Sequence, residues 1–205
     1  MTEFELTTLD CHPLATDELA RRAGDWLRAP GAAGRLLAAF RTEVGQLGRL
    51  ILLRCFDSTE EAAAERARTL TAQAPFGGRE VATAYRQESY RQFPFLPPLR
   101  QAQKSAIYEI RSYELRPGGL PATIAAWERA IEPAAGYTRH LVTCMYATDG
   151  APRIVHIWGF DSFEERLGLR ASHYAAGTWP PKGGPQQIAR ACSTLAFDAP
   201  GLERD

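Results

Sequence analysis

The sequence has no long apolar run and no excess of either charge, and each absence removes a class of partner. No run approaches the ~20 apolar residues that a membrane-spanning helix needs. The N-terminal MTEFELTTLD has neither the basic start nor the apolar centre of a signal peptide. The 24 basic and 24 acidic residues cancel, which gives no reason to expect nucleic acid as a partner. We therefore expect a cytoplasmic protein without a membrane or nucleic-acid partner.

Cysteines are few and scattered, and the common cofactor motifs are absent. Cys11, Cys55, Cys144 and Cys192 form no C-x-x-C pair and lie near no histidine cluster, so the sequence supports neither a disulfide framework nor a metal site. We expect reduced core thiols. The patterns G-x-G-x-x-G, G-x-x-x-x-G-K-[ST], G-x-S-x-G and H-E-x-x-H are missing, which argues against dinucleotide, P-loop, hydrolase-elbow and zinc-protease chemistry. No cofactor is expected.

One segment of the chain occurs twice. Residues 50–66 read LILLRCFDSTEEAAAER, and residues 153–170 read RIVHIWGFDSFEERLGLR. Their phenylalanine, aspartate, serine, two glutamates and arginine recur 104 residues apart, from Phe56 and Phe160 to Arg66 and Arg170. The chain is therefore two copies of one unit of ordinary small-domain size. We expect a first unit at 1–92, a linker at 93–104, a second unit at 105–200 and a tail at 201–205.

Each copy shows the same order of predicted elements. Alternating, β-branched or aromatic runs predict strands at 4–9, 35–40, 49–56 and 80–90, and again at 107–115, 140–146, 153–160 and 188–197. Helices are predicted at 16–28, 58–74, 121–131 and from 162 onward. Ser58 with Glu61, and Ser162 with Glu165, have the spacing of a capping box, which favours a helix start. Both copies thus read β-α-β-β-α-β.

The second copy resembles the NIPSNAP family. The family's Y-E-x-R-x-Y strand, its turn glycine, its H-x-W strand and its D-S-x-E-E-R helix start are matched by Tyr108, Glu109, Arg111, Tyr113, Gly118, His156, Trp158 and residues 161–166. The first copy matches more loosely, through the T-E-x-G turn at residues 42–45. The family's asparagine after that turn is replaced in both copies, and its W-x-x-Y ending is WPPKGGP here.

The resemblance implies an α+β fold with two tandem ferredoxin-like β-α-β-β-α-β units forming a pseudo-two-fold dimeric α/β barrel. Barrels of this superfamily include cofactor-free oxygenases, cyclases, isomerases and haem-degrading enzymes as well as binding proteins, so the fold does not fix the chemistry. The near absence of lysine beside many alanines is typical of a high-GC bacterial coding bias, which favours bacterial, including secondary, metabolism.

The differences between the copies indicate where function lies, because residues that both copies share are explained by the shared fold. Polar or aromatic residues of the second copy replace apolar or small ones at Arg111, Tyr113, His156, Arg166 and His173, and Trp158 replaces Arg54. Strand periodicity places His156 and Trp158 on one face with Phe160, and Glu109, Arg111 and Tyr113 on one face of the first strand. The two faces are expected to meet.

The expected function is cofactor-independent acid/base chemistry, namely isomerisation, cyclisation or oxygenation of a small apolar, polyketide-like metabolite. His156 would act as general base or acid, while Arg111 and Tyr113 would stabilise an enolate or phenolate. The substrate-binding residues would be Glu109, Trp158, Phe160, Arg166 and His173.

Other interpretations of the same residues stay open. Glu109 and Arg111 could form an internal ion pair, and His156 could be a satisfied core residue. The protein could also be a non-catalytic ligand-binding or protein-interaction module, including a haem-binding version with a histidine as axial ligand. A homodimer is a further option among the partners.

Overall fold

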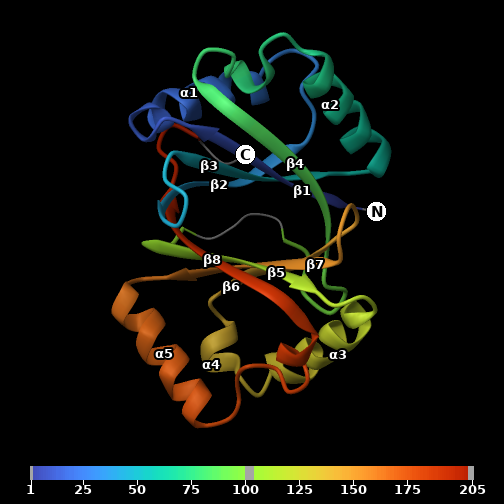
Figure 1. The fold of residues 1–205 in the computed structure, drawn as a ribbon, viewed down its shortest axis with the longest axis vertical. Coiled ribbons are helices and arrows are strands. Elements are labelled where there is room, and N and C mark those ends of the chain that lie inside the picture. Colours follow the sequence, from blue (N-terminus) through green and yellow to red (C-terminus); the bar gives the residue numbers. More distant parts are fainter. Residues whose placement is uncertain (1, 100–103, 203–205) are drawn as a thin grey trace. The chain divides into compact units, whose positions relative to one another are not determined.

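The computed structural model describes residues 2–99 and 104–202, which fall into two compact units. The first unit contains the described residues up to Arg91 together with those from Leu195 onward. The second contains the rest, including Gln92–Leu99. Each unit combines antiparallel strands with helices (Figure 1).

The first unit begins with β1 (Glu3–Cys11), α1 (Thr16–Leu27) and the hairpin of β2 (Arg35–Val44) and β3 (Arg49–Phe56). It continues with α2 (Thr59–Thr71) and β4 (Ala82–Gln92), and single 3-10 turns precede α1 and β4. Strand β1 lies between β3 and β4, and β2 pairs with β3, all antiparallel. The last residues of β8 (Ile188–Asp198) pair with the outer side of β2.

The second unit repeats this order with β5 (Ile107–Leu115), α3 (Gly119–Ile131), β6 (Leu141–Ala147), β7 (Arg153–Phe160), α5 (Phe163–Ala175) and β8. Its strand order is β8-β5-β7-β6, with β5 and β6 antiparallel to β7. The predicted β-α-β-β-α-β order is therefore confirmed in both copies. The short helix α4 (Ala135–Thr138) was not predicted, because four residues are too few for an amphipathic pattern to show.

The helices that follow the repeated segment begin as the sequence predicted. Ser58 Oγ accepts from the Glu61 amide at 3.1 Å, and Ser162 Oγ accepts from the Glu165 amide at 3.0 Å. The glutamates reach back, so that the amides of Asp57 and Asp161 each donate to a carboxylate at 2.8 Å. Both capping boxes satisfy first-turn amides that the helix itself leaves unpaired, and they are confirmed.

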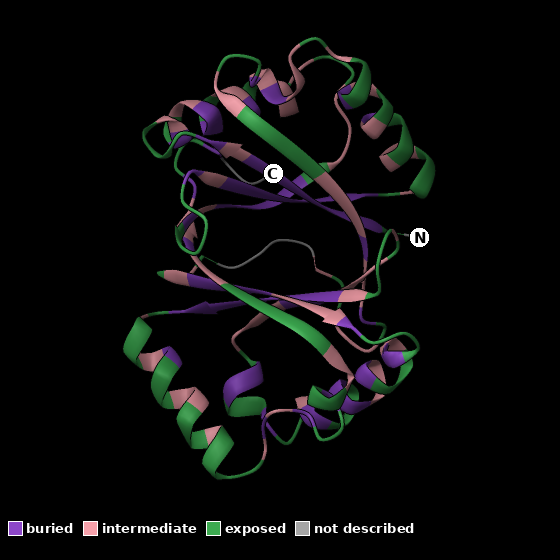
Figure 2. Ribbon diagram, viewed as in Figure 1, coloured by how far each residue is buried: buried purple, intermediate pink, exposed green. Residues whose placement is uncertain are grey.

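Apolar side chains between sheet and helices form one core in each unit. Leu9, Leu19 and Phe76 are completely buried in the first core, and Trp158 is completely buried in the second. Figure 2 shows the central strands as buried, whereas the middle parts of β4 and β8 are exposed. Cys192 lies on that exposed part of β8, so the expectation of a core thiol is wrong there; the other three cysteines are buried. No helix in residues 2–99 and 104–202 has the length and apolarity needed to cross a membrane.

The unit boundaries differ from the expected ones at two places. The prolines of residues 93–99 suggested an extended linker, but Phe93 is only 1% exposed and packs edge-on against Trp127 in the core of the second unit. Residues 195–202 belong to the first unit, because Ala199 and Leu202 lie in its core. Residues 100–103 of the expected linker and 203–205 of the expected tail lie outside the described part of the chain.

Candidate functional site

A cavity of about 220 Å³ lies inside the second unit. It is bounded by β5, β7, α3, the end of α5 and the Pro- and Gly-rich segment 179–188. Its walls are mostly apolar, and its most polar lining residues are Arg111, Tyr113 and His156. Tyr174 lines the cavity and is 42% exposed, so the cavity opens to solvent beside this residue. Its volume lies below the ~300–1,000 Å³ of drug-sized ligand sites, which suits a small ligand.

The pairing of β5 with β7 brings the polar residues together. Arg111 lies directly opposite His156, Tyr113 opposite Ile154, and Glu109 opposite Trp158. Residues that face each other across an antiparallel pair have their side chains on the same face of the sheet. The two predicted faces therefore coincide, and the catalytic residues expected from the sequence, Arg111, Tyr113 and His156, all line the one cavity.

His156 has an asymmetric hydrogen-bonding environment. Trp158 Nε1 donates to His156 Nδ1 at 2.6 Å, and an indole nitrogen can only donate. Nδ1 therefore carries no proton, and the neutral ring has its proton on Nε2. The Nε2 atom is buried and has no partner among the described residues. Burial, and after it the charge of Arg111, lower the pKa of His156 well below its ordinary value, so the ring is neutral. A neutral ring with its proton on Nε2 can donate a hydrogen bond from that atom.

Glu109 holds two arginines behind the cavity. Arg111 Nη2 donates to Glu109 Oε2 at 2.9 Å, and Arg166 from α5 donates to Oε1. Ser193 Oγ also donates to Oε1, at 2.7 Å. Burial opposes ionisation of Glu109, but the two arginines outweigh it and lower the pKa of Glu109 to about 2. Arg111 is thereby fixed in place, and its second terminal nitrogen, Nη1, donates to the hydroxyl of Tyr113 at 3.3 Å. The internal ion pair that the sequence left open is present.

The five residues expected to bind substrate do not line the cavity. Glu109 and Arg166 belong to the ion cluster behind it, and Phe160 lies in the core. Trp158 is fully buried, with its ring stacked on Tyr137 at 4.5 Å. The Nδ1 atom of His173 lies 2.9 Å from the hydroxyl of Thr178.

Several lining residues were missed by the sequence reasoning. Trp127 on α3 belongs both to the core and to the cavity wall, with its ring edge-on to His156 at 4.9 Å. Trp179 and three prolines of the WPPKGGP segment form a further wall. The departure of this segment from the family's W-x-x-Y ending was the signal that could have pointed to it. Tyr137 was also missed; its buried hydroxyl has no partner among the described residues, and burial raises its pKa to about 12.

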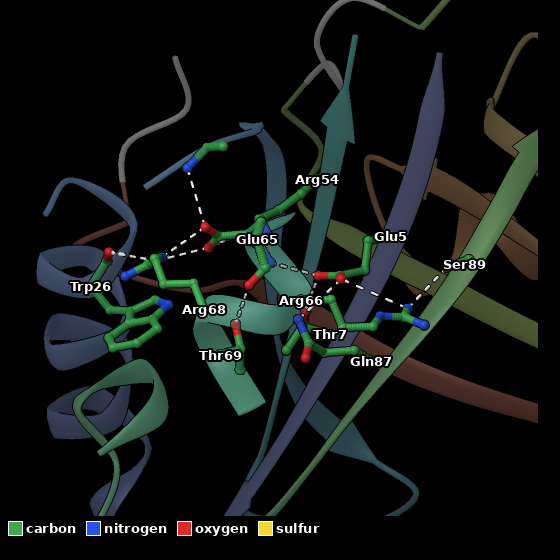
Figure 3. A network of polar contacts seen from close by, with 11 residues as sticks. Glu5, Thr7, Trp26, Arg54, Glu65, Arg66, Arg68, Thr69, Gln87 and Ser89 are labelled. Atoms are coloured by element: carbon green, nitrogen blue, oxygen red, sulfur yellow. Dashed lines mark hydrogen bonds and ion pairs between the residues drawn. The ribbon is translucent and has the colours of Figure 1, made fainter. Parts of the chain in front are cut away.

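The first unit has a buried ion network around the residue that corresponds to Trp158 (Figure 3). Arg54, the counterpart of Trp158, donates to Glu5 at 2.7 Å and to Glu65 at 3.0 Å. Arg68 closes the network by donating to both oxygens of Glu65 at 2.7 Å, and its guanidinium lies over the ring of Trp26. The two copies thus share a buried glutamate at the same strand position, Glu5 and Glu109, but surround it differently.

Comparison with solved structures shows the class of fold. An anthrone oxidase-like protein is 11% identical, with 99% of this chain and 95% of that chain covered and a TM-score of 0.68. A candidate monooxygenase from Lactobacillus acidophilus is 8% identical, with 97% and 94% covered and a TM-score of 0.63. This likeness over nearly the whole length shows the dimeric α/β barrel fold, as predicted, with two ferredoxin-like units in one chain.

The second unit identifies the family. The NIPSNAP family profile matches residues 108–195. A NIPSNAP family protein with unknown function from Agrobacterium tumefaciens is 30% identical, with 48% of this chain and 95% of that chain covered and a TM-score of 0.41. The chain belongs to the NIPSNAP family, as the motifs predicted. No curated protein matches it.

Proposed function

We propose that the second unit is a small-molecule enzyme site that binds an enolisable or phenolic compound and stabilises its oxyanion without a cofactor. The observation that carries the proposal is the convergence of Arg111, His156 and Tyr113 on one mostly apolar cavity, together with the buried Nε2 of His156, which has no partner among the described residues. Preorganised donors in a largely apolar site stabilise developing negative charge better than donors in bulk water do.

The charge balance beside the cavity favours an anion. Two arginines, Arg111 and Arg166, share the single carboxylate of Glu109, which leaves one positive charge uncompensated within this ion cluster. Burial alone would lower the pKa of Arg111, but Tyr113 and Glu109 raise it above its ordinary value, so Arg111 stays charged. A neutral ligand that can lose a proton from oxygen or from an α-carbon gains most from this arrangement, because its anion provides the missing negative charge.

His156 would contribute as a neutral donor. A buried N–H without a partner costs ~1–3 kcal/mol, and a ligand oxygen placed within hydrogen-bonding distance of Nε2 would recover that energy. The ligand proton leaves to water, and the electron pair stays on the ligand as an enolate or phenolate. That electron pair serves isomerisation or cyclisation, and with dioxygen as co-reactant it serves oxygenation. We place this chemistry in bacterial metabolism of small apolar, polyketide-like compounds.

The haem-binding alternative fits His156 poorly. A neutral histidine that binds iron through Nε2 keeps its proton on Nδ1. Here Trp158 donates its own N–H to Nδ1. If iron were bound at Nε2, the proton on Nδ1 would face the Trp158 N–H across 2.6 Å, and the two donors would repel each other. The geometry therefore favours an organic oxyanion over an iron-bound cofactor at this residue.

The proposal is tested with 4-nitrophenol, whose phenolate is yellow and whose neutral form is not. At a pH below the phenol's own pKa, the wild-type protein should raise the phenolate fraction on binding. Arg111→Gln should weaken phenolate binding at least ~10-fold, as expected for the loss of a charge-assisted contact worth ~1.5–3 kcal/mol. Arg129→Gln, on the exposed face of α3, is the matched control and should change nothing. Binding of the neutral phenol only, or unchanged binding by Arg111→Gln, would refute the oxyanion site.

Catalysis is separated from binding by hydrogen–deuterium exchange at the α-carbon of a small aryl ketone, followed by NMR. Wild-type protein should accelerate the exchange, and Arg111→Gln should lose most of the acceleration. If phenolate binds but no exchange is accelerated, the site is a binding module and the catalytic half of the proposal is wrong.

A further inference from the structure

We infer that Trp158 is a positioning residue that holds His156 as a hydrogen-bond donor toward the cavity. This inference rests on the proposed function, since it assigns the residue that makes His156 suitable for binding an oxyanion. Trp158 does not line the cavity itself, so it acts only through His156. The role differs from the direct substrate contact that the sequence suggested for this tryptophan.

The hydrogen bond between the two rings selects one tautomer. Neutral imidazole carries its proton on Nδ1 or on Nε2, and the nitrogen without the proton is an acceptor. Because the Trp158 N–H donates to Nδ1 at 2.6 Å, only the tautomer with the proton on Nε2 satisfies the indole. In the opposite tautomer, the Nδ1–H would face the indole N–H of Trp158, and Nε2 would offer the ligand a lone pair and no proton.

Packing fixes Trp158 in the orientation that this bond requires. Its ring stacks on Tyr137 with 24° between the planes, and Trp179 lies edge-on to it at 5.6 Å. The residue is fully buried and lies on the same strand as His156, two residues away. An indole held on both sides cannot turn its N–H elsewhere, so the donor stays aimed at Nδ1 whether or not a ligand is present.

The charged and titratable neighbours of His156 mostly favour a neutral ring, and the one that does not opposes this effect only partly. Arg111, opposite His156 on β5, disfavours a second proton on the ring, and Glu109 partly opposes that effect. Tyr113 contacts the ring edge-on at 4.8 Å, and its hydroxyl is engaged by Arg111. The ring is thus kept neutral by its surroundings, and Trp158 decides which nitrogen holds the proton.

The comparison of the copies supports a paired role. In the first unit the two positions are Leu52 and Arg54, and neither the histidine nor the tryptophan is present without the other. Arg54 turns instead to Glu5 and Glu65. The histidine and its indole donor therefore occur together in the unit that contains the cavity lined by Arg111 and Tyr113.

The test is the tautomer of His156, read from the nitrogen chemical shifts of the histidine ring in the whole protein without ligand. Wild type should show a single tautomer with the proton on Nε2 between pH 5 and pH 8, the range in which an ordinary histidine titrates. Trp158→Phe keeps an aromatic ring but removes the donor; it should give a mixture of the two neutral tautomers. Trp127→Phe and Trp179→Phe remove indoles that contact the same cluster without bonding to His156, and should leave the tautomer unchanged.

The functional readout is 4-nitrophenolate binding, which should weaken about 10-fold in Trp158→Phe, the loss of roughly one good hydrogen bond to a charged oxygen. A wild-type ring with the proton on Nδ1, or a Trp158→Phe variant whose tautomer does not change, overturns the inference even if phenolate binds. Failure of phenolate to bind wild type, with the Nε2 tautomer intact, refutes the proposed function and not the tautomer assignment. A variant that loses affinity with an unchanged tautomer shows a structural role only.

Discussion

Arg54 of the first unit lies against Glu5, with 2.7 Å between Nη2 and Oε1, inside a core from which both side chains are almost fully shielded. Glu109, the counterpart of Glu5, receives its arginines from β5 and α5 instead. The buried carboxylate at this strand position thus forms ion pairs with arginines from different elements in the two units. Because the second unit needs no arginine at position 158, that position carries the indole that bonds to His156.

The first prediction is one ligand per chain. Arg54 occupies in the first unit the position from which Trp158 orients His156 in the second, so the first unit lacks the paired histidine and tryptophan at these strand positions. Isothermal titration with 4-nitrophenol should give a stoichiometry of one. Arg54→Met should lower the free energy of unfolding by ~3–5 kcal/mol, because Glu5 and Glu65 lose a buried partner. Its affinity for 4-nitrophenol should stay unchanged. Two equal sites in wild type would contradict this prediction.

The second prediction concerns the ion cluster behind the cavity. Glu109→Gln removes the countercharge of Arg111 and Arg166, so the free energy of unfolding should fall by ~3–5 kcal/mol in urea denaturation at pH 7. Glu128→Gln on the exposed face of α3 should change it by less than ~0.5 kcal/mol. Equal effects of the two substitutions would show that the buried cluster contributes no more to the free energy of unfolding than an exposed glutamate does.

The same cluster predicts how wild type responds to acid. The pKa of Glu109 is lowered from 4.5 to about 2, so its ionised form stabilises the folded state fully above its unfolded-state pKa. That stabilisation should be lost as the pH falls from about 4.5 toward 2. Glu109→Gln should lack this part of the pH dependence, and a parallel loss in both proteins between these pH values would count against the assignment.

The third prediction uses the neutral state of His156. Its pKa in the folded protein lies well below 6.5, so below that pH the unfolded chain takes up a proton that the folded chain does not. Stability should therefore fall on acidification from pH 6.5, with a contribution of up to ~1.4 kcal/mol per pH unit from this residue. Urea denaturation of His156→Gln across pH 5–8 should show a shallower slope than wild type. Equal slopes would mean that His156 protonates as an ordinary histidine.

The fourth prediction tests the repeated helix starts. Ser58→Ala and Ser162→Ala each remove the oxygen that accepts a first-turn amide, and each should lower the free energy of unfolding by ~1 kcal/mol. Ser172→Ala, at an exposed position on α5, should be nearly neutral in thermal denaturation. If all three serines behave alike, the capping interpretation of the repeated segment is wrong.

The fold could be predicted well because two independent copies repeat the same local signals. Periodicity and the capping serines give the element order, and the family motifs add the barrel class. The polar cluster could also be foreseen, because strand alternation fixes which side chains share a face: Arg111 and His156 meet as expected. The ends of elements and the short helix α4 depend on tertiary contacts that no local pattern shows.

The remainder of the site could not be predicted for specific physical reasons. Whether Trp158 or Trp127 faces a cavity depends on a few ångströms of packing between α3 and β7, and periodicity does not resolve this. The segment 179–185 reads as a loop, yet Trp179 is 3% exposed and forms a wall. The neutral state of His156 depends on burial and on the charge of Arg111 together, which lower its pKa and which the sequence alone does not show.

The path of strand β8 affects how the protein can fold during its synthesis. Its first residues belong to the second unit, whereas Leu195–Asp198 pair with β2 and Leu202 enters the core of the first unit. As the chain leaves the ribosome, the first unit must therefore wait, incomplete, until the whole second unit has been translated. The N-terminal unit is therefore still incomplete when a chaperone could first bind it or when the chain is released early. A stop codon placed shortly before residue 195 would destabilise the unit that is encoded first.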